Sequence, residues 1–161
     1  MSKKINKVEK LSDNFTLDEF VYSETAQKNK IENIPSFSHL DNIKRLVNEI
    51  LQPLRDSWEN YCKSENLGTP SIIISSGYRC PLLNRLVGGS KTSVHCIGAA
   101  ADIIPANGEL EQFATFVEGW IDDKEFDQLI LEECNSEGVP RWLHIGHINR
   151  QAQQRKQIKR A

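Results

Sequence analysis

The spacing of apolar residues changes partway along the chain, and this change limits the folds that are open to it. Between residues 40 and 61 apolar side chains recur every three or four positions, which is the pattern of one long amphipathic helix. Pro53 lies inside this pattern and lacks a backbone donor, so we expect a kink or a break near Gln52. A short helix is predicted to begin after Thr16, which forms a capping-box pattern with Glu19.

After Gly68 the apolar residues gather in short runs instead. The pattern predicts four strands, at 71–75, 99–104, 128–132 and 142–148. A helix is expected at 109–121, and the last two strands flank a loop with Gly138 and Pro140, which favours an antiparallel hairpin. Helices followed by a strand-rich half predict an α+β fold, in which a small antiparallel sheet packs against helices.

The composition fits one soluble globular domain. The 161 residues are 39% hydrophobic, and 20 basic against 22 acidic residues give a net charge of -2, which points neither to nucleic acid nor to an anionic membrane. No apolar stretch approaches the roughly 18 residues needed to cross a bilayer. The lysine-rich start lacks the apolar run of a signal peptide, so we expect cytoplasmic synthesis without a signal peptide and no membrane insertion.

Basic residues gather at both ends of the chain. We divide it into a basic N-terminal tail at 1–14, a single domain at 15–148 and a basic C-terminal tail at 149–161. Both tails are predicted to be solvated, and the alternative is a loose electrostatic hold on an anionic polymer.

The four cysteines contain no C-x-x-C pair, so their spacing does not fit a cysteine-only zinc site. In a chain without an export signal we expect buried free thiols rather than disulfides. Cys96 lies beside His95, but we interpret it as a packing residue.

Histidines and acids in the strand-rich half have a spacing that suits a metal site. His95 and Asp102 lie seven residues apart, which suits a ligand on a loop followed by a ligand on the strand that the loop feeds. On the last strand His144 is favoured over His147 as a third ligand, because Gly146 shares its face and leaves room. Two histidines and a carboxylate would leave one zinc position open for water. On spacing alone, hydrogen-bonded or surface histidines are the commoner outcome.

Longer motifs surround these residues. Residues 93–102 (SVHCIGAAAD) fit S-x-H-x-x-G-x-A-x-D at all five specified positions and resemble the signature of the zinc D-alanyl-D-alanine carboxypeptidase superfamily, peptidase family M15. Residues 76–84 are similar to the S-G-Y-R-x-x-x-x-N segment of that family, and FDQLI and WLHI at 126–130 and 142–145 resemble its D-Q-L and W-x-H elements. Specific matches cover residues 71–147, and 15–55 resembles phage and prophage members loosely.

The resemblance implies roles for individual residues. It implies three zinc ligands: His95, Asp102 and His144. Arg79 would bind the substrate and act in catalysis, because a guanidinium can hold a carboxylate or a polarised carbonyl with two parallel hydrogen bonds. Ser93 would hydrogen-bond a ligand or the substrate backbone, and Trp142 is expected to form a wall of the substrate pocket.

Three residues are candidates for the general base. Family members often carry an acid three residues before the last histidine, but that position is Arg141 here, which cannot accept a proton. We favour Glu132, because strand pairing could bring it near His144. Glu133 points the opposite way along the strand, and His147 would need a bulge to face the site.

These features together predict a zinc-dependent metallopeptidase of peptidoglycan stem peptides. It would hydrolyse a bond next to a D-amino acid, as a D-Ala-D-Ala carboxypeptidase or an endolysin-type endopeptidase of a phage. We expect a monomer that acts on the cell wall after release through a separate pore, without a specific nucleic-acid partner. The alternative is a catalytically inactive zinc-containing binding module of the same fold. A phage structural or nucleic-acid protein that uses its basic termini is a weaker third hypothesis.

Overall fold

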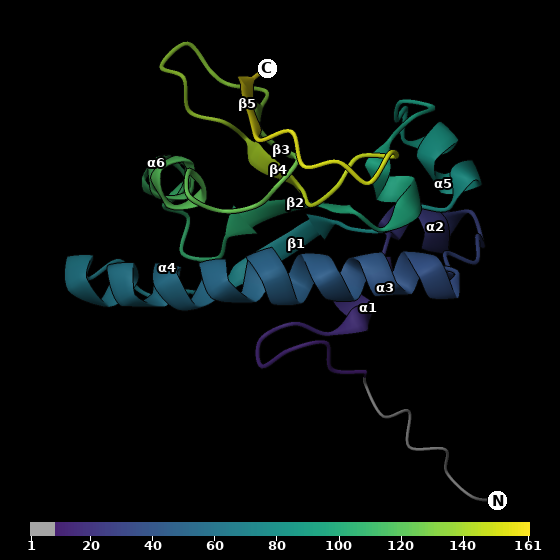
Figure 1. The fold of residues 1–161 in the computed structure, drawn as a ribbon, viewed down its shortest axis with the longest axis horizontal. Coiled ribbons are helices and arrows are strands. Elements are labelled where there is room, and N and C mark those ends of the chain that lie inside the picture. The colour runs from purple at the N-terminus through teal and green to yellow at the C-terminus, as the bar shows by residue number, and fades with distance from the viewer. Residues whose placement is uncertain (1–8) are drawn as a thin grey trace, which may run out of the picture.

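The computed structural model describes residues 9–161, whose arrangement is drawn in Figure 1. The helices are α1 (Leu17–Val21), α2 (Glu24–Lys28), α3 (Phe37–Leu46), α4 (Gln52–Glu65), α5 (Pro81–Leu86) and α6 (Leu110–Ile121). Two further turns are helical, the π-helical η1 (Val47–Leu51) and the 3-10 helix η2 (Val94–Ile97). The strands are β1 (Ile72–Ser76), β2 (Ala100–Pro105), β3 (Gln128–Glu132), β4 (Trp142–Gly146) and β5 (Gln157–Arg160). Within residues 9–161 no helix combines the length and apolarity needed to cross a membrane.

The predicted long helix is present, with the expected irregularity just before Pro53. Helices α3 and α4 run along one side of the molecule (Figure 1) and are joined by the π-helical turn η1. The backbone N–H of Gln52 bonds to the carbonyl of Val47, five residues back, instead of four. Apolar side chains on both sides of this turn, such as Leu46 and Leu54, are fully buried. The chain therefore accommodates Pro53 by widening one turn rather than by ending the helix.

The N-terminal lead-in folds onto this helix. Thr16 donates its backbone N–H to the Glu19 carboxylate at 2.7 Å, which confirms the predicted capping interaction. Lys10 forms an isolated bridge with Thr16, and Phe15 is buried in the core. Residues 9–14 of the predicted N-terminal tail are thus part of a turn, and 1–8 lie outside the described residues.

The sheet has the strand order β1-β2-β4-β3-β5. The first four strands in this order pair antiparallel, and the predicted hairpin is confirmed, with Glu132 opposite Trp142. β5 runs parallel to β3, so the sheet is mixed rather than wholly antiparallel. Where the sequence predicted a solvated tail at 149–161, residues 157–160 therefore add an edge strand. The open backbone groups at the edge of β3 provide the partners for this strand.

One face of the sheet is apolar and packs against the helices. Its side chains are Ala101, Ile103, Leu129, Leu131, Leu143 and Ile145. They meet the buried faces of α4 and α6, where Trp58 and Phe113 form an edge-to-face pair with ring centroids 5.0 Å apart. All four cysteines carry free thiols, as predicted, but only Cys62 and Cys96 are buried, whereas Cys80 and Cys134 are partly exposed. Because strand residues alternate, polar residues at the intervening positions lie together on the opposite face.

Candidate metal centre

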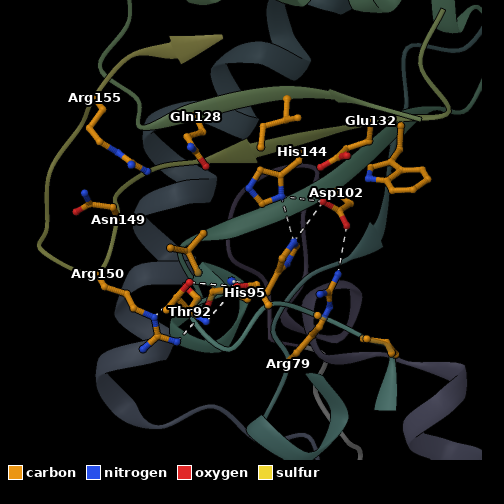
Figure 2. Close-up of a pocket in the computed structure, with 18 of the residues that line it drawn as sticks. Arg79, Thr92, His95, Asp102, Gln128, Glu132, His144, Asn149, Arg150 and Arg155 are labelled. Carbon is orange, nitrogen blue, oxygen red and sulfur yellow. Dashed lines mark hydrogen bonds and ion pairs between the residues drawn. The ribbon is translucent and has the colours of Figure 1, made fainter. Parts of the chain in front are cut away.

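Side chains of His95, Asp102 and His144 converge on the polar face of the sheet. Their ligand atoms all lie within 4.8 Å of one another, and all three residues are buried. His95 Nε2 is 3.2 Å from His144 Nδ1 and 3.3 Å from Asp102 Oδ1, and His144 Nδ1 is 3.1 Å from Asp102 Oδ1. Figure 2 shows the three groups pointing toward one another.

Strand pairing and a short helical turn place these three residues. Asp102 on β2 lies directly opposite His144 on β4, and the next neighbour of His144 across the sheet is Ile130 on β3. His95 comes from η2, whose first turn is capped by Ser93, because the Ser93 hydroxyl accepts the backbone N–H of His95 at 3.3 Å. The seven positions between His95 and Asp102 thus lead from a helical turn to the strand that follows it, as the sequence spacing predicted.

Gly98 closes η2 and could not be replaced by a larger residue without movement. Its φ of +74° is in the left-handed region, and a Cβ there would lie 2.4 Å from the carbonyl oxygen of His39 on α3. The side chain of Asn42 on the same helix donates to the carbonyl of Ile97 at 2.9 Å. Helix α3 therefore supports the turn that carries His95.

A backbone contact sets the orientation of the His95 ring. Its Nδ1 lies 2.8 Å from the carbonyl oxygen of Gly77, which can only accept, so Nδ1 carries the proton and donates it. The lone pair of Nε2 is then directed at Asp102 and His144. Such a second hydrogen bond is typical of histidines that bind metals, because it fixes both the tautomer and the ring.

The donor atoms fit a zinc ion. Three ligands held about 2.0–2.1 Å from a tetrahedral zinc lie about 3.3 Å from one another. The separations of 3.1–3.3 Å among the three donors match this arrangement. Two imidazoles and one carboxylate are also a ligand set that zinc binds in catalytic sites.

Burial and charge keep the three donors in the protonation states that a metal requires. Burial lowers the pKa of His95 despite the neighbouring Asp102, so the imidazole stays neutral at neutral pH. Burial by itself raises the pKa of Asp102, but its contacts with His144 and His95 outweigh the burial and hold that pKa well below its usual range. The carboxylate is therefore ionised and available as a ligand.

The cluster opens into a pocket of about 760 Å³. Arg79 lies in its wall, with Nη2 3.4 Å from Asp102 Oδ2 and Nε donating to the Ser76 hydroxyl at 3.0 Å. Ser93 and Trp142, both predicted at the substrate site, also line the pocket. A volume of this size is typical of small-ligand sites.

Of the three candidate bases, Glu132 is the one that the structure places in the pocket wall. Burial raises the pKa of its carboxyl. Glu133 instead adopts a φ of +48° and forms an ion pair with Arg141. His147 is fully buried on the other face, with Nε2 2.6 Å from Glu49 Oε2, so it is corrected from candidate base to a buried structural residue. Strand alternation had placed both residues away from the site, and the unbroken β2–β4 and β3–β4 registers contain no bulge that would reverse this.

Several pocket residues were not identified from the sequence. They are Gln128, Asn149, Arg150, Gln151 and Arg155. Gln128 could have been found, because strand alternation places it on the face of Ile130 and Glu132. The other four belong to the segment that precedes β5, which carried no strand or motif signal.

The helical lead-in supports the loop that holds both Arg79 and the Gly77 carbonyl. Tyr78 donates its backbone N–H to the carbonyl of Phe20 on α1 at 2.7 Å, and a Cβ on Gly77 would lie 2.5 Å from the same oxygen. The side chain of Asn33 bonds to the backbone of Tyr78 and Cys80, at 2.8 and 2.7 Å. The position of His95 therefore depends on residues more than sixty positions earlier.

Comparison with known families identifies the family of this chain. The sequence model of the family described as Peptidase M15 matches residues 13–135, which is more than half of the chain and includes Arg79, His95, Asp102 and Glu132. The match ends before His144, which is joined to the site by strand pairing. A search of curated proteins found no match. Peptidases of this family depend on zinc, in agreement with the donor set. The chain therefore belongs to the Peptidase M15 family and is indicated to be a metallopeptidase.

Proposed function

We propose that the protein is a zinc-dependent peptidase that hydrolyses a bond next to a D-amino acid in peptidoglycan stem peptides. One observation carries the proposal: three converging donors, an arginine and a half-buried carboxylate line the same pocket. Membership of the Peptidase M15 family supports the reaction class. The proposal includes both a terminal D-alanine carboxypeptidase and an endolysin-type endopeptidase, and the products distinguish them.

His95, Asp102 and His144 would hold the zinc ion. Bound there, zinc would supply a Lewis acid that polarises the scissile carbonyl and lowers the pKa of water. Arg79 orients the substrate, because its guanidinium is fixed by Ser76 and Asp102 and can donate to a peptide carbonyl or carboxylate. The contact of Arg79 with Asp102 also keeps that carboxylate in place.

Glu132 accepts the proton of the attacking water at a carboxylate oxygen and returns it to the leaving amine. The pKa of this carboxyl is raised by burial, which makes the carboxylate a stronger base for the first transfer and still leaves it able to return the proton in the second. Trp142 lies directly opposite Glu132 in the β3–β4 pair and lines the same wall of the pocket. Its indole ring limits the access of bulk water to the carboxylate.

A second function, a zinc-containing binding module without catalysis, is favoured by one observation. The position three residues before His144 is occupied by Arg141, which forms an ion pair with Glu133 and lies 5.9 Å from the centre of the Trp142 ring. No acid can act from that position. The two functions differ in their need for Glu132, because the peptidase requires this carboxylate as its base and the binding module does not.

The test is digestion of purified peptidoglycan, with products identified by mass spectrometry and bound zinc measured on each protein. Wild type and the matched control Glu133→Gln are expected to bind one zinc and release the same new peptide ends. Glu132→Gln should keep its zinc and lose about 10²- to 10⁴-fold of its activity. His95→Ala should lose zinc and products together. A wild type that binds zinc yet releases no product from several peptidoglycans would favour the binding module.

A further inference from the structure

We propose that Arg150 binds a carboxylate group of the substrate. This inference rests on the proposed function, since it assigns a further binding position in the same pocket. Figure 2 shows Arg150 and Glu132 on opposite sides of the three donor side chains, His95, Asp102 and His144, and both residues line the pocket. A ligand that reaches from the metal toward Arg150 would therefore extend away from the general base.

The charge of Arg150 is not paired within the described part of the chain. Its Nε donates to the carbonyl of Thr92 at 3.0 Å and its Nη2 to the carbonyl of Ser93 at 3.1 Å, and these acceptors carry no net charge. Across residues 9–161 no carboxylate lies within ion-pair distance of its guanidinium. The other two pocket arginines are paired, Arg79 with Asp102 and Arg155 with Asp127.

The two backbone contacts also fix the guanidinium in place. A guanidinium has five N–H donors in a planar fork, and Arg150 uses Nε and one N–H of Nη2, which leaves the remaining donors for a ligand. Because the guanidinium is already oriented, the Arg150 side chain loses little further conformational entropy when a carboxylate binds to it. Thr92 and Ser93 immediately precede η2, so this anion position and the His95 position belong to one segment.

The charges that line the pocket favour an anionic ligand. Three arginines line it, at positions 79, 150 and 155, and they are balanced by Asp102, Glu132 and the Asp127 partner of Arg155. A bound zinc ion would add two further positive charges. A pocket with such an excess of positive charge attracts and orients anions. Stem peptides offer two such groups, the C-terminal carboxylate and the α-carboxylate of D-glutamate, and the experiment below distinguishes them.

The experiment uses the pentapeptide L-Ala-γ-D-Glu-L-Lys-D-Ala-D-Ala and two analogues, each with one of these two carboxylates converted to the amide. Dissociation constants are measured by calorimetry on zinc-loaded full chains that carry Glu132→Gln, so that the peptide is not hydrolysed, and kcat/KM is measured in parallel on chains that keep Glu132. Wild type is expected to prefer the free acid by about 10- to 100-fold in one of the two comparisons, the range of a charge-assisted hydrogen bond. Arg150→Met should remove that preference.

Arg85→Met is the matched control, because Arg85 is an exposed arginine on α5 that does not line the pocket. It carries the same change in net charge and is expected to keep the preference for the acid. If Arg150 only holds the 92–93 backbone in place, Arg150→Met will weaken acid and amide equally, and the proposal is overturned. Zinc content, measured on each variant, detects any displacement of His95.

Failure of this proposal and failure of the peptidase function give different results. Arg150-dependent preference for an acid without any hydrolysis would support the carboxylate position and count against the peptidase. Hydrolysis with no Arg150-dependent preference in either comparison would support the peptidase and overturn the carboxylate position. Binding of none of the three peptides would overturn the carboxylate position as well.

Discussion

Replacing Arg155 by methionine is expected to lower the free energy of unfolding by about 3 kcal/mol at pH 7. Arg155 holds the carboxylate of Asp127 with two parallel contacts, Nε to Oδ1 at 2.7 Å and Nη2 to Oδ2 at 2.8 Å. The Asp127 side chain is 1% exposed, so methionine would leave a buried carboxylate without its counter-charge.

The magnitude follows from the burial of the two partners. Breaking a fully buried ion pair from one side costs about 3–5 kcal/mol. The Arg155 side chain is 39% exposed, so water can enter after the substitution, and we expect the lower end of that range. For a chain of this length the loss corresponds to a decrease in Tm of about 6–12 °C.

The loss should also depend on pH. In wild type, burial raises the pKa of Asp127, but the contacts with Arg155 outweigh it, and the folded-state pKa lies below the unfolded one. This pair therefore stabilises the fold above the ordinary aspartate pKa of about 3.9, and the contribution is lost as the pH falls further. In Arg155→Met the guanidinium contacts are lost while the burial and the hydrogen bond from the backbone N–H of residue 155 remain, so protonation in acid relieves much of the penalty. The difference between the two proteins should be largest at pH 7 and shrink toward pH 3.

Urea unfolding of the metal-free proteins at pH 7 and pH 3 measures both effects. Arg160→Met is the matched control, because its ion pair with Glu118 is solvent-exposed and should contribute at most about 1 kcal/mol. If Arg155→Met were as stable as the control, or lost the same free energy at both pH values, the account of Asp127 as a charge buried and held by Arg155 would be refuted.

Three further substitutions test the site and the core. His95→Ala is expected to lose zinc in an equilibrium competition with a chelator, whereas His39→Ala, outside the cluster, should retain it. Gly98→Ala should cost about 1–3 kcal/mol more than Gly108→Ala in urea unfolding, because both have positive φ but only Gly98 is close to another backbone. Trp58→Ala should lower the unfolding free energy by about 3–5 kcal/mol, since its side chain is fully buried, and a smaller loss would show that the site collapses around the change.

The central part of the site could be predicted from the sequence because strand alternation is a strict rule. His144 and His147 differ by three positions, so they must point to opposite faces, and the structure places one in the pocket and the other beside Glu49. The same rule separates Glu132 from Glu133. The capping box and the break before Pro53 were predictable for a similar reason, since each depends on residues close in sequence.

The C-terminal segment could not be predicted in this way. Its residues are basic and mostly exposed, which is also the pattern of a solvated tail. What orders it is a set of contacts distant in sequence, such as Arg155 with Asp127 and the carbonyl of Asp127 with the N–H of Gln157. Arg150 reaches the pocket through the same segment. Local patterns do not report which backbone edge a later segment will join.

The π-helical turn η1 also sets the rotational phase of the helix that follows it. Each residue advances a regular helix by about 100°, and the i→i−5 turn takes up one extra residue, so deleting one residue between Val47 and Leu51 would give a regular α-helix with the facing of α4 unchanged. Leu54 and Trp58 would then stay in the core. The same deletion within the regular helix α3 would instead rotate α4 by about 100° and turn these side chains out of the core. The wide turn therefore gives the long helix one place where its length can change without altering the packing of the domain.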